Sequence, residues 1–294
     1  MDKINIPKIK LPKKIEQYRS IVIDELLTDP MILAFLKENN LDSSFVADHI
    51  VGFIQMADEN KPCQNCKGYA KCAKKPKGFI TTFIKSDEGY EVSYRKCPKY
   101  LEYEPLLDNY DYLDIPTEEW LENSLSNVVQ NPQRKKFISL AVQLLQNQTD
   151  TGLYVYGKSG VGKSYLTIAL INDLIRIDSL KASFVNVRAF IEDCKQSLDN
   201  KNNYIADQIS ALQNIDILVL DDLGNERVSE WSANIIYDIV DYRYRNHLLT
   251  FYTSNYSLNE LESVYEKAKV SRLVYTISSS SKEVEIRGVD LNRK

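Results

Sequence analysis

The chain has 294 residues, of which 44% are hydrophobic and 27% charged, and its formal net charge at pH 7 is −4. This length predicts about two domains, and the composition excludes a chain that is disordered over most of its length. A net acidic protein is not expected to coat DNA through a broad basic surface, although a local contact with DNA stays open. The sequence has no apolar run of about 18 residues, and its start is rich in lysine, so we expect a soluble cytoplasmic protein with no membrane segment.

Charge is distributed unevenly along the chain, and the distribution predicts its organisation. Residues 1–100 carry 17 basic and 13 acidic side chains, residues 101–130 carry eight acids and no base, and residues 131–294 carry 20 of each. We therefore predict an N-terminal domain over 1–100, an acidic linker over 101–130 and a C-terminal domain over 131–294. Apolar clusters with helical spacing over residues 15–56 predict a small domain rich in α-helix.

The C-terminal domain alternates segments typical of strands with segments typical of helices. The expected strands are residues 153–156, 183–187, 215–220, 248–253 and 283–286, and the segments between them have helical spacing. Such alternation predicts an α/β fold with a five-stranded parallel sheet that is covered by helices on both faces. We expect ligands at the carboxyl ends of the strands.

A phosphate-binding motif lies between the first of these strands and the next helical segment. The pattern G-x-x-x-x-G-K-[ST] is matched in full by Gly157, Lys158, Ser159, Gly160, Val161, Gly162, Lys163 and Ser164. A strand before the motif and a helix after it form the context in which this pattern is specific. Backbone N–H groups of the loop and of the helix start bind phosphates. We expect Lys163 to contact the β- and γ-phosphates and Ser164 to ligate Mg²⁺, which predicts ATP or ADP and magnesium as cofactors.

Polar residues follow two later strands. The apolar strand that ends at residue 220 is followed by Asp221 and Asp222. We expect Asp221 to hold the Mg²⁺ ion and Asp222 to orient or deprotonate the attacking water, although Asp222 also suits a turn. Asn255 follows the strand 248–253 and is expected to position that water against the γ-phosphate.

Four of the five cysteines lie within 35 residues, at Cys63, Cys66, Cys72 and Cys97. Such clustering in a cytosolic protein favours a metal over disulfides, and four thiolates predict a structural Zn²⁺ site. A redox role for the C-x-x-C pair is less favoured because the strand–helix pattern of thioredoxins is absent. The lysines that surround the cysteines either compensate thiolate charge or meet an acidic partner. Cys194 lies in a helical segment and is expected to be an ordinary buried thiol.

Together the motifs GKSGVGKS, LVLDDLG, FYTSN and Ser271-Arg272-Leu273 resemble those of the AAA+ ATPases. Within that class, the phrase LDDLG and the segment 242–255 are similar to the replicative helicase loaders of the DnaI and DnaC type and to transposition ATPases of the IstB type. The resemblance implies that Arg272 is an arginine finger, which reaches the nucleotide of a neighbouring subunit. Asp222 stands where most AAA+ proteins have Glu. Too few residues follow position 286 for a full helical lid, so we expect none.

The resemblance to helicase loaders of the DnaI type covers almost the whole chain. It implies an N-terminal zinc domain that contacts a hexameric DnaB-family helicase, with single-stranded DNA and other primosome initiation proteins as further partners and self-association in the ATP-bound state. Some relatives use a His ligand for zinc, but no His lies between Cys66 and Cys97, so Cys72 is required.

An IstB-like partner of a transposase is the alternative function, and a P-loop kinase fits the order of the motifs poorly. The segment Tyr242-Arg-Tyr-Arg245 suits either single-stranded DNA or a half-buried helix end.

Overall fold

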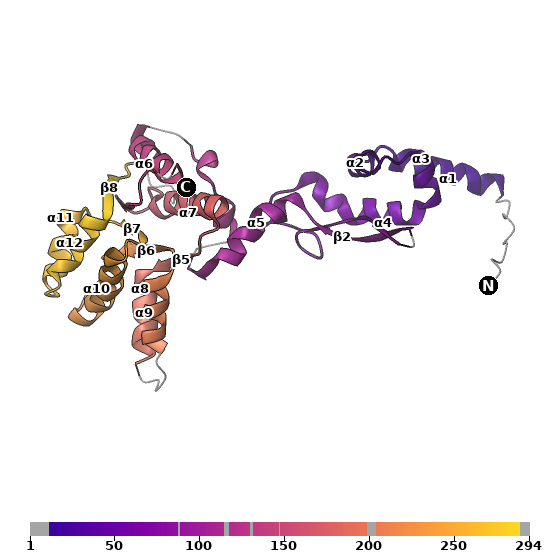
Figure 1. The fold of residues 1–294 in the computed structure, drawn as a ribbon. Coiled ribbons are helices and arrows are strands. Elements are labelled where there is room, and N and C mark those ends of the chain that lie inside the picture. The colour runs from indigo at the N-terminus through magenta and orange to yellow at the C-terminus, as the bar shows by residue number, and fades with distance from the viewer. Residues whose placement is uncertain are drawn as a thin grey trace. The chain divides into compact units, whose positions relative to one another are not determined.

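The structure of the chain is a computed structural model that describes residues 12–87, 89–114, 118–129, 132–146, 148–198 and 204–288. The chain forms two compact units, Met1–Glu102 and Tyr103–Lys294. Figure 1 shows the first unit in indigo and purple and the second in colours from magenta to yellow. Helix α5 (Pro98–Asn109) contains the boundary between the two units.

The first unit packs four helices with a two-stranded antiparallel hairpin. The elements are α1 (Lys13–Leu26), α2 (Pro30–Glu38), α3 (Ser43–Asp48), α4 (Ile50–Asn60), the 3-10 helix η1 (Lys61–Asn65), β1 (Phe79–Ser86) and β2 (Gly89–Lys96). Helix α2 begins after Asp29, whose carboxylate accepts the N–H groups of Met31 and Ile32. Helices therefore form over the range 15–56, where apolar spacing predicted them.

A cluster of aromatic rings joins these helices to the hairpin. Phe53 of α4 and Phe83 of β1 lie with ring centroids 4.6 Å apart, and Phe35 of α2 packs on both. The hairpin was not predicted. Its first strand buries four consecutive residues, Ile80 to Phe83, and so lacks the strict alternation that marks a strand with one exposed face. The unit is thus a mixture of helix and strand, and its description as α-rich was incomplete.

The second unit is built on a parallel sheet whose described strands lie in the order β3-β5-β6-β7-β4-β8. The strands are β3 (Tyr110–Leu113), β4 (Gly152–Tyr156), β5 (Ala182–Asn186), β6 (Ile217–Leu223), β7 (Leu249–Ser254) and β8 (Ser281–Glu285). All five predicted strands are present. The predicted number was wrong, because β3 pairs with β5 as a sixth strand. Its four residues lie in the tyrosine-rich acidic segment, where no run of apolar residues marked a strand.

Helices cover both faces of this sheet. They are α6 (Lys135–Leu145), α7 (Lys163–Asp178), α8 (Val187–Gln196), α9 (Tyr204–Asn214), α10 (Glu230–Arg245), α11 (Leu258–Glu266) and α12 (Ser271–Ser280), with the 3-10 helices η2 (Glu118–Glu122), η3 (Leu125–Asn127) and η4 (Pro132–Arg134). Helices α6 and α7 lie on one side of the strands and α8, α9 and α10 on the other (Figure 1). The central strands are buried on both faces, as expected for a parallel sheet.

Most of the predicted acidic linker, residues 101–130, belongs to the second unit, which begins at Tyr103. Tyr110 of β3 donates its hydroxyl proton to Oδ1 of Asn172 at 2.9 Å. The amide of Asn172, which is fully buried in α7, donates to the carbonyl oxygens of Trp120 and Asn123 at 3.0 Å each. Residues 115–117 and 130 lie outside the described part of the chain. A buried amide that satisfies several carbonyls fixes this segment to the helix that follows the phosphate loop.

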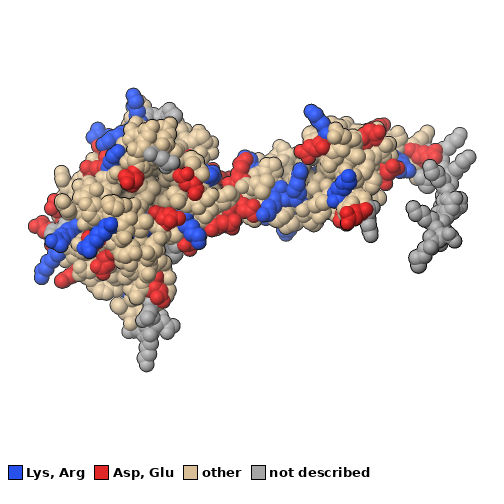
Figure 2. Space-filling model, viewed as in Figure 1, with Lys and Arg blue, Asp and Glu red and all other residues tan. Residues whose placement is uncertain are grey.

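The surface carries charges of both signs. On the face shown in Figure 2, acidic and basic side chains are interspersed over the second unit. On this face the charges do not form the continuous basic strip that nonspecific binding of nucleic acid requires.

Within the described residues, no helix has both the length and the apolar character needed to cross a bilayer.

Candidate nucleotide site

The loop from Gly157 to Gly162 connects β4 to α7, as the sequence predicted. Gly157 has φ 150° and lies so close to the end of β8 that an added Cβ atom would be 2.2 Å from the carbonyl oxygen of Ile286. Gly162 has φ 94° and directly precedes the first residue of α7. Both positions therefore require glycine, and α7 begins where its free N–H groups and positive dipole end face the loop.

Lys163 is buried at the start of α7, with 7% of its surface exposed. Its Nζ donates to the carbonyl oxygens of Gly157 at 3.0 Å and Lys158 at 3.1 Å, and to Oδ1 of Asn255 at 2.9 Å. Burial lowers the pKa of Lys163, while the nearby carboxylates of Asp222 and Asp221 raise it. The ammonium group is thus held under the loop, where phosphate oxygens would offer it stronger acceptors than carbonyls.

Asp221 lies in β6 at the carboxyl edge of the sheet and is 9% exposed. Burial raises the pKa of Asp221, and hydrogen bonds from the hydroxyls of Ser164 and Thr253 oppose this effect. The Thr253 hydroxyl lies 2.7 Å from Oδ1. A carboxylate and a hydroxyl are the hard oxygen ligands that Mg²⁺ accepts, and a bound cation would favour the charged form of this buried acid. The donor set of Ser164 and Asp221 therefore fits the predicted magnesium site.

Asp222 follows with φ 60°, a left-handed backbone conformation that is uncommon for a residue other than glycine. Its N–H donates to the Thr253 hydroxyl at 2.9 Å. Its two carboxylate oxygens accept from the side-chain amides of Asn225 at 2.7 Å and Asn255 at 3.2 Å. These contacts fix the direction of the carboxylate, as its predicted role in orienting water requires.

Asn255 links the two sides of the site. Its Oδ1 accepts from Lys163, and its Nδ2 donates to Asp222. The structure therefore brings together Lys163, Asp222 and Asn255, which lie far apart in the sequence. It places them around a cavity of about 550 Å³ that is lined by Trp120, Ser159, Gly160, Gly162, Lys163, Ser164, Tyr165, Asp221, Asp222, Asn225 and Asn255. Its volume and polar groups suit a ligand of nucleotide size.

Arg272 does not line this cavity. It is the second residue of α12, and its side chain is exposed. The predicted arginine finger is thus available to another molecule, while its action on a neighbouring nucleotide stays a prediction.

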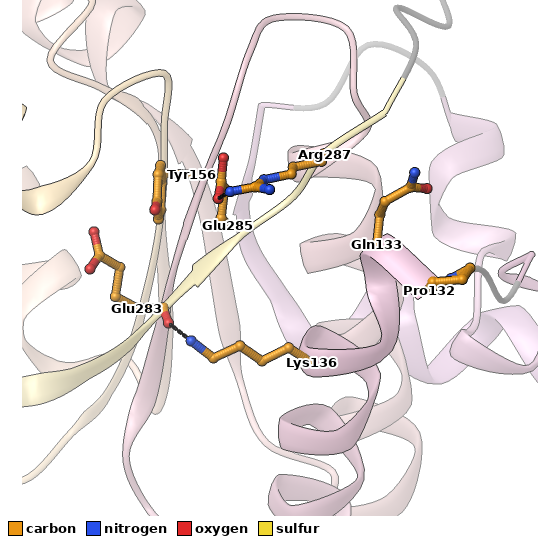
Figure 3. Close-up of a pocket in the computed structure, with 7 residues that line it drawn as sticks. All are labelled: Pro132, Gln133, Lys136, Tyr156, Glu283, Glu285 and Arg287. Carbon is orange, nitrogen blue, oxygen red and sulfur yellow. Dashed lines mark hydrogen bonds and ion pairs between the residues drawn. The ribbon is translucent and has the colours of Figure 1, made fainter.

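A second cavity, of about 460 Å³, is lined by Tyr156, the residue before the loop, and by residues of η4, α6 and the end of β8. Figure 3 shows its basic side chains engaged with β8: Arg287 forms an ion pair with Glu285 at 2.7 Å, and Lys136 donates to the carbonyl oxygen of Glu283 at 2.8 Å. Arg287 is 74% exposed in this pair. Arg287 is therefore a solvent-exposed side chain paired with a carboxylate at the end of β8.

The four clustered cysteines lie in the first unit, near η1 and at the end of β2. Cys66 is exposed and the other three are half-buried. Burial raises the pKa of Cys63, Lys74 lowers it, and Cys72, Cys66 and Cys97 raise it. Among the described residues, however, no three His, Cys, Asp or Glu side chains are grouped as ligands of one ion. The structure does not support the predicted zinc site. Cys194 is buried, as expected.

The interpretation of residues 242–245 as a DNA surface is wrong for Arg243. This side chain is completely buried and donates to five backbone carbonyls and to the hydroxyl of Thr250. Arg245 pairs with Asp241 at 2.6 Å. Arg243 therefore joins the end of α10 to the end of α9, to the connection between α9 and β6, and to β7, and it is not available to a ligand.

Comparison with known proteins agrees with this geometry. The family model described as "IstB-like ATP binding protein" matches residues 115–294. The chain belongs to that family. The predicted resemblance is thus confirmed, and the second unit is an ATP-binding domain of the IstB/DnaC-like AAA+ type.

Two helicase loaders are among the similar proteins. The replicative helicase loader DnaI of Bacillus subtilis (strain 168) is 23% identical, over 94% of this chain and 92% of DnaI. The replicative helicase loader DnaC of Escherichia coli (strain K12) is 26% identical, over 40% of this chain and 47% of DnaC. A crystal structure of DnaI matches with a TM-score of 0.55 at 29% identity, over 61% of this chain and 98% of that chain. A structure from Streptococcus pyogenes serotype M3 has a TM-score of 0.54 at 25% identity, over 63% and 97%.

Several residues of this family member's site were missed by sequence reasoning. Thr253 bonds both Asp221 and the backbone of Asp222, and Asn225 bonds the Asp222 carboxylate. Thr253 lies in β7, two residues before Asn255, and this spacing was a usable signal because side chains two residues apart in an extended segment point to the same side. Trp120 and Tyr165 also line the cavity, and their rings pack edge to face with centroids 6.0 Å apart. No sequence motif indicated either residue.

Proposed function

We propose that this chain is an ATP-dependent loader of the replicative helicase. In this role it binds a hexameric DnaB-family helicase and transfers it to single-stranded DNA during initiation and restart of replication, together with other primosome initiation proteins. The observation that carries the proposal is the extent of the similarity to DnaI. It covers 94% of this chain, so it includes the first unit as well as the ATPase unit. A shared first unit points to a shared partner, because the nucleotide site alone would suit many AAA+ functions.

In the ATPase reaction, the chain's own residues bind and orient the nucleotide. The N–H groups of residues 157–162 and the Lys163 ammonium would hold the phosphates, replacing the carbonyl contacts that Nζ makes now. Ser164 and Asp221 would hold Mg²⁺, which when bound neutralises the charge that develops on the phosphates. Asp222 would accept hydrogen bonds from the attacking water, in a direction set by Asn225 and Asn255.

The exposed Arg272 supports a role for self-association in this reaction. Because Arg272 lies outside the cavity of its own chain, it would complete the site of a second copy in the ATP-bound state. An arginine supplied from a neighbour stabilises the charge of the transition state. The rate of ATP hydrolysis would then depend on assembly, so free and assembled copies of the loader would differ in whether they hold ATP or ADP.

Zinc binding by Cys63, Cys66, Cys72 and Cys97 is a separate proposal for the first unit. The clustering of the four cysteines within 35 residues of the sequence and the affinity of Zn²⁺ for thiolates support it. Metal analysis of the purified chain tests it, with Cys72→Ser as the variant and the buried Cys194→Ser as the matched control. We expect one zinc per chain in the wild type and the control and a loss of zinc in Cys72→Ser. Undiminished zinc in Cys72→Ser would contradict a four-cysteine site.

The loader proposal is tested by mixing the purified full-length chain with the replicative helicase of the same host, with and without ATP, and measuring complex mass by light scattering. We expect a complex in which several copies of the chain bind one hexamer.

The second candidate function is that of an ATPase partner of a transposase. It is favoured by the family match, which begins at residue 115 and leaves the first unit outside. Binding to a transposase, and none to the helicase, would favour that candidate.

A further inference from the structure

Three backbone groups at the end of β6 and in the turn after it form hydrogen bonds with side chains. Asp222 has φ 60° and Gly224 has φ 87°. The Thr253 hydroxyl accepts the N–H of Asp222 at 2.9 Å, and the Ser254 hydroxyl donates to the carbonyl oxygen of Leu223 at 2.6 Å. A left-handed conformation at an aspartate is strained and persists only where its surroundings hold it.

Glu226 provides the third of these contacts. Its Oε2 accepts the N–H of Gly224 at 2.8 Å, and its Oε1 accepts a short hydrogen bond from the hydroxyl of Tyr265. Glu226 is 6% exposed and Tyr265 is fully buried. Among the described residues no basic side chain forms an ion pair with Glu226, so these two hydrogen bonds hold its carboxylate. A buried carboxylate with no cation is costly and is not explained by stability alone.

The other face of the turn packs on α11. A Cβ atom added to Gly224 would be 2.8 Å from Cδ1 of Leu261, which lies one helical turn before Tyr265. Tyr256, which directly follows Asn255, lies on the same side, 3.1 Å from that position. The turn is therefore enclosed between α11 and the end of β7. The hydrogen bonds of Glu226 with Gly224 and with Tyr265 connect the turn to α11.

We propose that Glu226, oriented by Tyr265, is a positioning residue for ATP hydrolysis: it fixes the left-handed turn that presents Asp222 and Asn225 to the phosphate side of the cavity. The proposal rests on the ATPase function proposed above. Glu226 does not line the cavity, so it acts only through Asp222 and Asn225. Nucleotide binding depends on the loop 157–164 at the opposite side of the site. Loosening the turn should therefore slow turnover and leave nucleotide affinity unchanged.

Tyr265→Phe is the sharpest test, because it removes one hydroxyl and keeps the ring in the core. Tyr252→Phe is the matched control. Tyr252 is also a fully buried tyrosine of this core, and its hydroxyl lies at the long distance of 3.4 Å from the Ser280 hydroxyl. Affinity for a fluorescent ATP analogue, kcat for ATP hydrolysis and the melting temperature are measured for each full-length protein. For Tyr265→Phe we expect kcat to fall about fivefold or more with affinity within about twofold of the wild type, and for the control we expect both to be unchanged.

Substitution of Glu226 supplies the second arm. Glu226→Gln keeps an oxygen for the Gly224 N–H and an amide that can donate to the Tyr265 oxygen, so kcat should be reduced less than in Glu226→Ala. Wild-type kcat in Tyr265→Phe and in both Glu226 variants would overturn the proposal. It would also be overturned if kcat and affinity fell together in proportion to a lowered melting temperature, since that is the signature of a structural role. A wild-type protein that binds ATP but never hydrolyses it would instead refute the proposed ATPase function.

Discussion

Replacing Lys163 with alanine tests the nucleotide site most simply. The ammonium group lies within 3.1 Å of three oxygen atoms, two of them on the loop that would surround the phosphates. Charge-assisted hydrogen bonds of this kind contribute about 1.5–3 kcal/mol each. If two of them are made to phosphate oxygens, their loss costs about 3–6 kcal/mol, which corresponds to a Kd raised at least about 100-fold.

The assay is a titration of the full-length protein with a fluorescent ATP analogue in the presence of Mg²⁺. Lys282→Ala is the matched control, because Lys282 is an exposed lysine of β8 that does not line the nucleotide cavity. Far-ultraviolet circular dichroism shows whether both variants stay folded. A Kd for Lys163→Ala within about threefold of the wild type would correspond to less than 1 kcal/mol and would refute the assignment of Lys163 to the phosphates.

Three further substitutions follow from the described contacts. Arg272→Ala should bind ATP normally but lose the rise in specific ATPase rate with protein concentration; an unchanged rise would exclude an arginine finger. Asp221→Asn should abolish Mg²⁺-dependent hydrolysis yet raise the melting temperature in the absence of Mg²⁺, by ~2–4 °C for each kcal/mol of removed desolvation cost. Arg243→Leu should lower the free energy of unfolding by about 3 kcal/mol or more in urea titrations, because it leaves buried carbonyls without donors.

The Asp221→Asn prediction carries a pH dependence with a definite sign. Burial raises the pKa of Asp221 above that of the unfolded chain, so the ionised carboxylate destabilises the folded state at neutral pH. This cost disappears as the pH falls through the raised pKa and the carboxyl group becomes neutral. The stability gained by Asp221→Asn should therefore shrink on acidification, and a gain that grew instead would contradict the assignment of burial as the cause.

The control for Arg243→Leu is Arg245→Ala. Arg245 is an exposed arginine two residues after Arg243, and its replacement should change the free energy of unfolding by less than about 1 kcal/mol.

The sequence predicted which residues lie together at the candidate nucleotide site, because their positions are encoded locally. A phosphate loop needs glycines at fixed positions, and Gly157 and Gly162 have the backbone conformations that only glycine adopts readily. The carboxyl ends of neighbouring parallel strands meet at one edge, so the positions of Asp221 and Asn255 after their strands implied that they come together.

What the sequence did not predict depends on contacts between distant segments. Strand β3 exists because Tyr110 pairs with β5 and bonds Asn172, 62 residues away in the sequence. Arg243 looked like a surface cation, yet it is surrounded by the carbonyls of residues 212, 213, 215, 216 and 249. A charge pattern cannot reveal such partners, because buried polar groups are satisfied by backbone atoms that any residue type supplies.

The most direct test of the loader proposal is the transfer of the host's replicative helicase to circular single-stranded DNA. Helicase, ATP and the full-length chain are incubated with the DNA, and helicase bound to the circles is quantified after gel filtration. We predict that the wild-type chain increases the DNA-bound helicase and that Lys163→Ala does not. An equal amount of bound helicase with and without the chain, in a mixture where the helicase unwinds DNA once loaded, would contradict the proposal.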